Sequence, residues 1–163
     1  MARFSLRHAT ISDAERIFAL IHEHVDALVP RPLGNVVENV DRFTVAENGD
    51  GEMIGCAAYH ILPEIGLPLH ATVEIQSVAV RSQHRRMGVG KALVEEVIRR
   101  VAVFKPAEVL VLTFAPEFFT ALGFTEIPKT QVMHKLYTGC INCTKHANPF
   151  TCPEKAMVRK LGG

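Results

Sequence analysis

A basic turn with two glycines joins a predicted strand to a predicted helix in the middle of this 163-residue chain, and it narrows the available folds. Residues 71–81 are rich in valine and isoleucine, which is typical of a strand. Residues 89–104 carry apolar side chains at intervals of three and four, which predicts a helix ended by Pro106. Residues 108–114 form a short apolar run suited to a buried strand. This order predicts a layered domain of helices packed on a sheet.

The turn itself, residues 83–92, has the composition of an anion site. Gly88 and Gly90 carry no side chain that would keep backbone N–H groups away from a phosphate. The N-terminus of the following helix adds partial positive charge. Three basic side chains contribute full charges: Arg85, Arg86 and Lys91. From these residues alone, a tight turn with a solvated basic surface remains the alternative.

The rest of the chain supplies further strands and helices around this unit. Ser12, followed three residues later by Glu15, has capping-box spacing and predicts a helix that runs to Pro30. Residues 63–69 contain two prolines and are expected to form a loop. The other expected elements are strands at 4–8, 42–47, 53–62, 125–128 and 156–161, and short helices at 36–40 and 116–122. The predicted fold class is α/β (α+β), a mixed and mostly antiparallel sheet with helices on both faces.

Composition limits the function classes. With 48% hydrophobic and 21% charged residues, the chain can form a core and is not of the disordered type. The 18 basic and 17 acidic residues nearly balance, so we expect no general nucleic-acid binding. No apolar run reaches about 18 residues, and a charged N-terminus replaces the apolar core of a secretory signal. We therefore expect a cytoplasmic protein without a membrane partner, one domain over residues 1–163, with a homodimer as an open option.

The turn and its neighbours resemble the GNAT superfamily of acetyl-CoA-dependent N-acetyltransferases. The motif Arg85-x-x-Gly88-x-Gly90 follows a strand, and Leu122-Gly123-Phe124 closes a short helix, as in that superfamily. A Rossmann motif needs wider glycine spacing, and a P-loop needs Ser or Thr where Ala92 stands. The resemblance implies acetyl-CoA as cosubstrate and fourth and fifth strands that splay apart. Its implied coenzyme-binding residues are Val78, Ala79, Val80, Arg85, Arg86, Met87, Gly88, Val89, Gly90 and Lys91.

A narrower resemblance concerns the acetyl acceptor. Several segments look like the acetyltransferase domain of N-acetylglutamate synthases: 28–31, 45–47, 55–60, 74–80 and 111–114. This implies L-glutamate as the amine and a role in arginine biosynthesis. Another small amine as acceptor, and a non-catalytic coenzyme A sensor, remain alternatives. Arg31 is the best candidate for a carboxylate of the acceptor, because arginine can bind carboxylates through two hydrogen bonds; His60 and Thr113 are further candidate substrate-binding residues.

Acetyl transfer also requires proton removal, because an amino group with a pKa near 8 is mostly protonated at neutral pH. Glu74 is the candidate catalytic base, acting directly or through water; a polar residue on a solvated strand face is the alternative. Many relatives place an acidic tyrosine four residues before the glycine of the closing motif, where this chain has Phe119. Water, the amine's own proton, Tyr59, His60 or Thr113 remain as proton donors.

Cysteines cluster near the C-terminus. Cys140 and Cys143 have the Cys-x2-Cys spacing of a zinc knuckle, and Cys152 follows nine positions later. With His146 as a fourth ligand they form a candidate zinc site in an insertion at about residues 130–154. Reduced thiols are the alternative, since a second ligand pair of the usual spacing is absent from the sequence.

Overall fold

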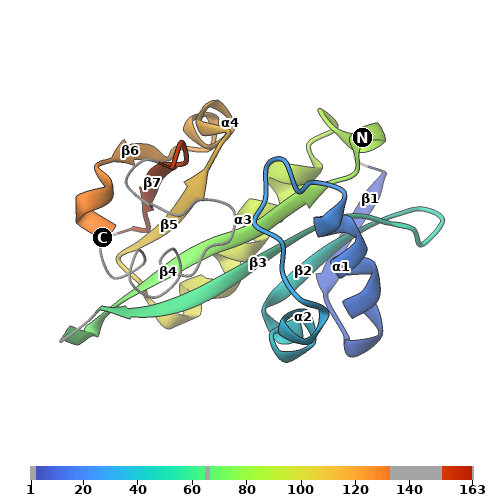
Figure 1. Cartoon of the computed structure of the whole chain (residues 1–163), viewed down its shortest axis with the longest axis horizontal. Coiled ribbons are helices and arrows are strands. Elements are labelled where there is room, and N and C mark those ends of the chain that lie inside the picture. The colour runs from blue at the N-terminus through green and yellow to red at the C-terminus, as the bar shows by residue number, and fades with distance from the viewer. Residues whose placement is uncertain (1–2, 65–66, 133–151, 163) are drawn as a thin grey trace. The chain divides into compact units, whose positions relative to one another are not determined.

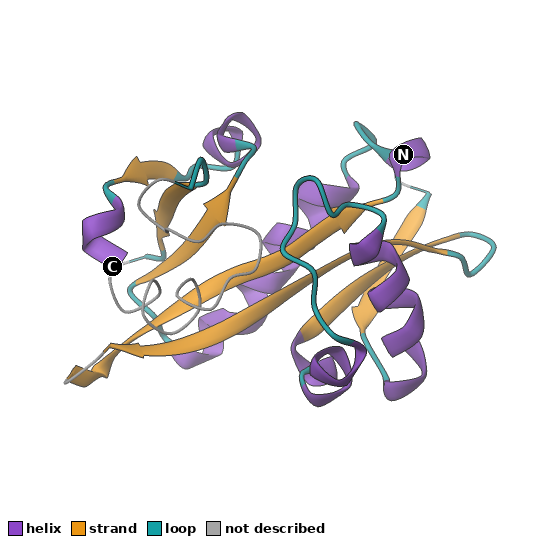
Figure 2. Cartoon of the chain, viewed as in Figure 1, coloured by secondary structure: helices purple, strands orange, loops and turns teal. Residues whose placement is uncertain are grey.

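The computed structural model describes residues 3–64, 67–132 and 152–162, and of residues 63–64 and 67–71 it describes the backbone alone (Figure 1). Figure 2 shows the distribution of helices and strands. The strands are β1 (Phe4–His8), β2 (Phe43–Asn48), β3 (Met53–Glu64), β4 (Leu67–Val80), β5 (Glu108–Thr113), β6 (Thr125–Ile127) and β7 (Lys155–Lys160). The α-helices are α1 (Ala14–His22), α2 (Leu33–Glu38), α3 (Val89–Val101) and α4 (Pro116–Ala121). Short 3₁₀ turns cover Ile11–Asp13, Val40–Arg42, Ser82–His84, Ala102–Phe104 and Lys129–Val132.

The strands form one hydrogen-bonded sheet in the order β1-β2-β3-β4-β5-β7-β6. Pairing is antiparallel at β1–β2, β2–β3, β5–β7 and β6–β7, and parallel at β4–β5. The parallel pairing aligns Val73 with Val109 and Glu74 with Leu110. Residues 75–80 of β4 have no β5 partner in the described part of the chain. The expected sheet, mixed and mostly antiparallel with splayed fourth and fifth strands, is confirmed.

The chain folds as two compact units. The first contains the described residues of 1–59 and 75–100, and the second those of 60–74 and 101–163. Strands β3 and β4 therefore each contribute to both units. The turn between β4 and α3 and Arg31 belong to the first unit, whereas Glu74 and the described end of the cysteine-bearing segment belong to the second.

In the first unit, helices cover both faces of the sheet. The core on one face joins α1 and α2 to the sheet, and it contains Ile17, Leu20, Val36, Phe43 and Cys56. On the other face, a side chain at Gly55 would meet Leu93 and Val89 of α3 at 2.9 and 3.1 Å. Successive residues of a strand point to opposite faces, so Gly55 and Cys56 mark the two covered sides. The expectation of helices on both faces is confirmed here.

The second unit packs α4 and β6 around the β5–β7 pair. Leu110, Val132 and Ala156 form its buried centre. The α4 helix ends where Gly123 takes a φ of +87°, a left-handed conformation that suits glycine at a helix end. The predicted glycine stop is therefore present.

The first helix begins differently from the sequence-based prediction. The carboxylate of Asp13 accepts the backbone N–H of Thr10 at 2.7 Å, so the capping box joins Thr10 and Asp13 rather than Ser12 and Glu15. Asp13 rather than Glu15 forms this cap because its side chain is only 1% exposed and is held by ion pairs with two arginines. The helix ends at His22, well before Pro30, because the apolar residues beyond it stay partly exposed, as Val25 does at 44%.

The two prolines of residues 63–69 do not produce the expected loop. Strand β3 continues to Glu64, and β4 begins at Leu67. Proline adopts extended backbone readily, and a strand tolerates it where its missing N–H is not needed for pairing. Among the described residues, no helix is long and apolar enough to cross a membrane.

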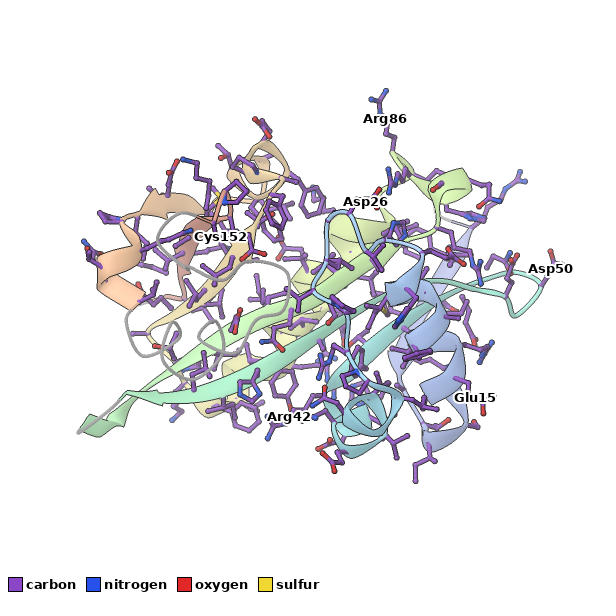
Figure 3. All side chains as sticks on the ribbon, viewed as in Figure 1. Glu15, Asp26, Arg42, Asp50, Arg86 and Cys152 are labelled. Carbon is purple, nitrogen blue, oxygen red and sulfur yellow. The ribbon has the colours of Figure 1, made fainter. Side chains whose placement is uncertain are left out.

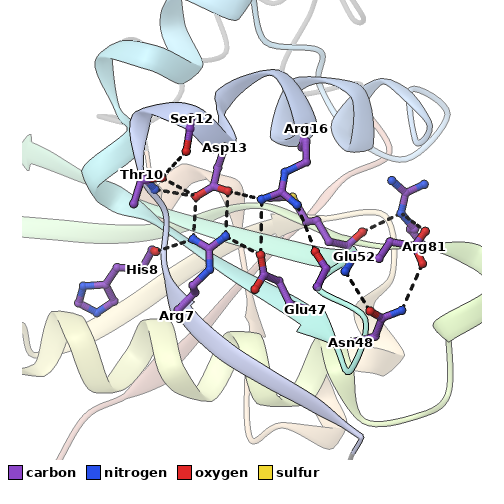
Figure 4. Close-up of polar contacts among 12 residues, drawn as sticks. Arg7, His8, Thr10, Ser12, Asp13, Arg16, Glu47, Asn48, Glu52 and Arg81 are labelled. Atoms are coloured by element: carbon purple, nitrogen blue, oxygen red, sulfur yellow. Dashed lines mark hydrogen bonds and ion pairs between the residues drawn. The ribbon is translucent and has the colours of Figure 1, made fainter.

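A buried carboxylate network fixes the N-terminal strand to α1 (Figure 4). Arg7 of β1 donates to both carboxylate oxygens of Asp13, at 2.7 and 2.9 Å, and Arg16 donates to Asp13 at 2.6 Å. Arg7 also contacts Glu47 of β2. The hydrogen bonds from Arg7 hold the pKa values of Asp13 and Glu47 below their usual range.

Candidate active site

The turn between β4 and α3 presents an uninterrupted row of backbone donors. Gly88 takes a φ of +83° and Arg86 a φ of +61°, which reverses the chain just before α3 begins at Val89. Within the described residues, no acceptor pairs with the backbone N–H groups of residues 86–91. Residues 85–88 are exposed, and the space beside Gly88 is open. An anion such as a pyrophosphate would therefore find donors that need not first break other bonds.

The basic side chains of this turn differ in their surroundings. Arg86 extends away from the ribbon (Figure 3), and Lys91 is exposed on the first turn of α3. Arg85 instead contacts the ring of His24, with Nη2 3.2 Å from Nδ1. Arg85 is thus held in position, whereas Arg86 is free to turn toward a ligand.

Arg81, which the sequence analysis did not select, anchors the beginning of the same turn. Its Nε donates to the carbonyl of Met53 at 2.7 Å, and its Nη1 donates to Glu23 at 3.0 Å. Its backbone N–H donates to the carbonyl of Ile54 at 2.8 Å. The turn is thereby tied to β3 and to the end of α1. A lone arginine after a strand carries no sequence signal for such a role.

Strand β4 is distorted next to the segment expected to bind pantetheine. Ser77 has a φ of +55°, which is uncommon for a residue other than glycine. The backbone carbonyl of Ser77 accepts the thiol of Cys56 at 3.5 Å. Beyond it, Val78 and Val80 are half-buried and Ala79 is buried. A bend here leaves backbone groups of β4 outside the β4–β5 pairing, as a strand that binds an extended ligand arm requires.

Arg31 lies at the same bend. Its Nη1 donates to Oγ of Ser77 at 3.2 Å, and its Nε donates to Oδ1 of Asn35 at 2.8 Å. The guanidinium stacks 5.0 Å from the centre of the Phe43 ring. These contacts orient the guanidinium and keep its charge close to the distorted part of β4. An oriented guanidinium of this kind suits a carboxylate.

Four residues that the sequence analysis discussed for catalysis or substrate binding belong to the second unit: Glu74, His60, Thr113 and Phe119. Glu74 is 3% exposed and lies at the end of the β4–β5 pairing. His60 is half-buried in β3. Thr113 uses Oγ1 to accept the N–H of Ala115 at 2.9 Å, so its hydroxyl supports the start of α4. Phe119 is buried and packs edge-on against Phe124, 5.3 Å between ring centres, which makes it a core residue.

The candidate zinc site lies mostly outside the described residues, since Cys140, Cys143 and His146 all fall there. Cys152 is described, and its backbone carbonyl accepts Nζ of Lys129 at 2.6 Å. No group of three or more potential metal ligands occurs within the described ranges. Cys56 is buried in the core, which raises the pKa of its thiol to about 12 and makes it unreactive.

Comparison with known proteins identifies relatives of this architecture. The family model described as an acetyltransferase (GNAT) domain matches residues 39–126, more than half of the chain. An uncharacterized N-acetyltransferase of Chlorobaculum tepidum is 32% identical over 158 residues and covers 96% of both chains. An amino-acid acetyltransferase of Mycobacterium tuberculosis is 34% identical over 136 residues, which is 81% of this chain and 74% of the relative.

Solved structures agree with these sequence matches. The protein Rv2747 from Mycobacterium tuberculosis, in complex with CoA and NLQ, has a TM-score of 0.79 at 27% identity and covers 97% of this chain and 99% of its own. The N-acetylglutamate synthase from Neisseria gonorrhoeae, complexed with coenzyme A and N-acetyl-glutamate, has a TM-score of 0.80 at 24% identity, over all of this chain and 36% of its own, and supports the fold. With its splayed sheet and its open turn of donors, the chain belongs to the GNAT family of acetyltransferases.

Proposed function

We propose that this enzyme transfers the acetyl group of acetyl-CoA to the amino group of a small amino acid, with L-glutamate as the first candidate. The observation that carries the proposal is Arg31, oriented by Asn35, Ser77 and the Phe43 ring beside the distorted part of β4. An amino acid always offers a carboxylate, and a glutamate offers two. The amino-acid acetyltransferase from M. tuberculosis supports the same substrate class. N-acetylglutamate formation would place the enzyme in arginine biosynthesis, in the cytoplasm.

Coenzyme A fits the first unit of the protein. The N–H groups of residues 86–91 can hold its pyrophosphate, with charge from Arg85, Arg86 and Lys91. The backbone of residues 78–80, beyond the β4–β5 pairing, can bind the pantetheine arm as an added strand would. Titration with coenzyme A tests this part of the proposal without any acceptor.

In the reaction, the neutral amine forms a bond to the thioester carbonyl carbon, the carbon–sulfur bond breaks, and the thiolate leaves. Glu74 is the proposed base that takes the proton lost by the amine, directly or through water. Phe119 cannot return a proton to the thiolate, because it has no ionisable hydrogen and is buried among aromatic side chains. Thr113 already accepts a backbone N–H through its oxygen, although its own hydroxyl hydrogen remains available.

The acceptor is identified by measuring thiol release from acetyl-CoA across a panel of amino acids and polyamines. We expect saturable release with glutamate and little with polyamines, which lack carboxylates. Saturable release with polyamines only would identify another class of acceptor. Coenzyme A binding without any acceptor-dependent release would favour the non-catalytic sensor and overturn the enzyme proposal.

Arg31→Ala tests the acceptor site directly. Removing one partner of a buried carboxylate pair costs about 2 to 5 kcal/mol, so the KM for glutamate should rise by about thirtyfold or more while the KM for acetyl-CoA changes little. Arg31→Lys should raise the KM for glutamate less than Arg31→Ala does but should not restore the wild-type value, because lysine lacks the paired donors of arginine. Arg99→Ala is the matched control, since Arg99 is 70% exposed and, among the described residues, pairs with neighbouring Glu96 on α3 alone. Equal changes in both KM values would place Arg31 outside the acceptor site.

A further inference from the structure

In the described part of the chain, two buried histidine nitrogens near the proposed anion-binding turn have no hydrogen-bond partner. Within the described residues, Nε2 of His24 and Nδ1 of His84 have no hydrogen-bond partner. His24 is 9% exposed and follows α1, and His84 belongs to the 3₁₀ turn that directly precedes Arg85. A buried polar atom left without a partner is costly, so such atoms usually meet water or a ligand. Because His24 contacts Arg85 of the turn and His84 directly precedes it, the missing partners point to a ligand of the turn.

The contact with Arg85 determines which nitrogen of the His24 ring is the acceptor. A guanidinium can only donate, so Nδ1 of His24, 3.2 Å from Nη2 of Arg85, must accept. The proton of the neutral ring then resides on Nε2. The unpaired Nε2 is therefore a donor, and the partner it lacks is an acceptor. A phosphate oxygen is the strongest acceptor that the proposed cosubstrate offers.

The backbone holds His24 firmly in this place. Its N–H donates to the carbonyl of Ile21 at 3.0 Å, and its carbonyl accepts the N–H groups of Ala27 and Leu28 at 3.0 and 2.8 Å. The adjacent Glu23 accepts Arg81 at 3.0 Å, which joins the segment after α1 to the beginning of the turn. Figure 3 labels Asp26 and Arg86, which come from these two neighbouring segments. These bonds fix the backbone of His24, and the contact of Nδ1 with Arg85 orients its ring.

We infer that His24 is a further coenzyme-binding residue: its Nε2–H donates to a phosphate oxygen of coenzyme A while its Nδ1 orients Arg85 toward the same phosphates. This inference rests on the proposed use of coenzyme A. It adds a residue from the segment after α1 to a site otherwise built from β4 and α3. The phosphate concerned is either the pyrophosphate or the 3′-phosphate, since both present the same acceptor chemistry.

The test compares three substitutions that separate the two ring nitrogens. Glutamine places an amide donor near the Nε2 position, asparagine keeps a group only near Nδ1, and leucine keeps neither. Calorimetric titration with coenzyme A should show an affinity within about threefold of the wild type in His24→Gln. In His24→Asn and His24→Leu the affinity should fall about tenfold to a hundredfold, because one hydrogen bond to a charged group is lost. His22→Leu is the matched control, because His22 is exposed on the same helix end. Melting without ligand checks that each variant is folded.

Two coenzyme fragments identify the phosphate. If His24→Leu binds dephospho-coenzyme A as tightly as the wild type does, the 3′-phosphate is the partner. If its affinity for dephospho-coenzyme A is still reduced but its affinity for pantetheine is not, the pyrophosphate is the partner. An equal loss with all three ligands would mean that His24 only supports the fold, and the inference would fail. Unchanged coenzyme A affinity in both His24→Leu and His24→Asn would also overturn it. If the wild-type protein itself bound no coenzyme A, the proposed function would fail first.

Discussion

Replacing Asp13 with asparagine should remove a large part of the stability of the first unit. Asparagine has the same shape, but one carboxylate oxygen becomes an amino group that faces donors. Oδ1 accepts Arg7 and Arg16, and Oδ2 accepts Arg7 and both donors of Thr10. Whichever oxygen is replaced, at least two hydrogen bonds are lost.

The magnitude follows from the kind of bond and from solvent access. Hydrogen bonds to charged groups contribute about 1.5 to 3 kcal/mol each, which gives about 3 to 6 kcal/mol for two. The side chains of Arg7 and Arg16 are 36% and 43% exposed, so both can turn to water, and we reduce the loss by about half. The expected decrease in the free energy of unfolding is therefore about 1.5 to 3 kcal/mol at pH 7.

Urea unfolding followed by circular dichroism measures this difference, and Asp50→Asn, in the exposed turn after β2, is the control. Because the pKa of Asp13 is lowered in the folded protein, its stabilising effect is complete above the unfolded pKa near 4 and is lost as pH falls further. The gap between wild type and Asp13→Asn should therefore be constant from pH 7 to about 5 and narrow below about 4. A loss under about 1 kcal/mol at pH 7, or a gap that widens in acid, would refute this reasoning.

Three further predictions concern the site and its support. Glu74→Gln should lower the turnover number by about 10² to 10⁴ at neutral pH and leave coenzyme A affinity intact, and higher pH should partly restore turnover. A decrease in turnover below tenfold in steady-state kinetics would exclude Glu74 as the base. Gly90→Val should weaken coenzyme A binding about tenfold or more in titrations, because a branched side chain at the start of α3 obstructs the backbone donors. Gly55→Ala should cost about 1 to 3 kcal/mol in unfolding experiments, since its Cβ would lie 2.9 Å from Leu93 and 3.1 Å from the carbonyl of Ala79, whereas Gly49→Ala, in open space, should be nearly neutral.

The sequence predicted the elements whose signals are local and repeated. The apolar period of α3, the valine-rich strands on either side and the glycine stop after α4 all appear at about the expected residues. The start of α1 was predicted wrongly because two capping patterns overlap at residues 10–15. The ion pairs with Arg7 and Arg16 favour Asp13 over Glu15 as the capping carboxylate. Whether these arginines lie close to Asp13 depends on how the chain folds and is not encoded in the capping pattern.

The candidate site was predictable where a motif encodes the backbone. The arrangement of Gly88 and Gly90 before a helix indicated accessible backbone N–H groups, and those of residues 86–91 have no acceptor within the described ranges. The contacts of Arg31 with Ser77, and of Arg85 with His24, join residues 46 and 61 positions apart. No periodicity or spacing reports such contacts, so Ser77 and His24 could not have been selected from the sequence.

The left-handed backbone of Ser77 sets a limit on how this enzyme could be made more robust. A side chain in that conformation costs about 1 to 2 kcal/mol relative to glycine. Glycine would relieve the cost, yet it would also delete the hydroxyl that accepts Arg31. A selection for melting temperature alone would therefore favour the change that removes this support of Arg31, the residue proposed to bind the acceptor. Under the proposed function, stability and substrate binding place opposite demands on this one position, and a library of stabilised variants should keep the serine.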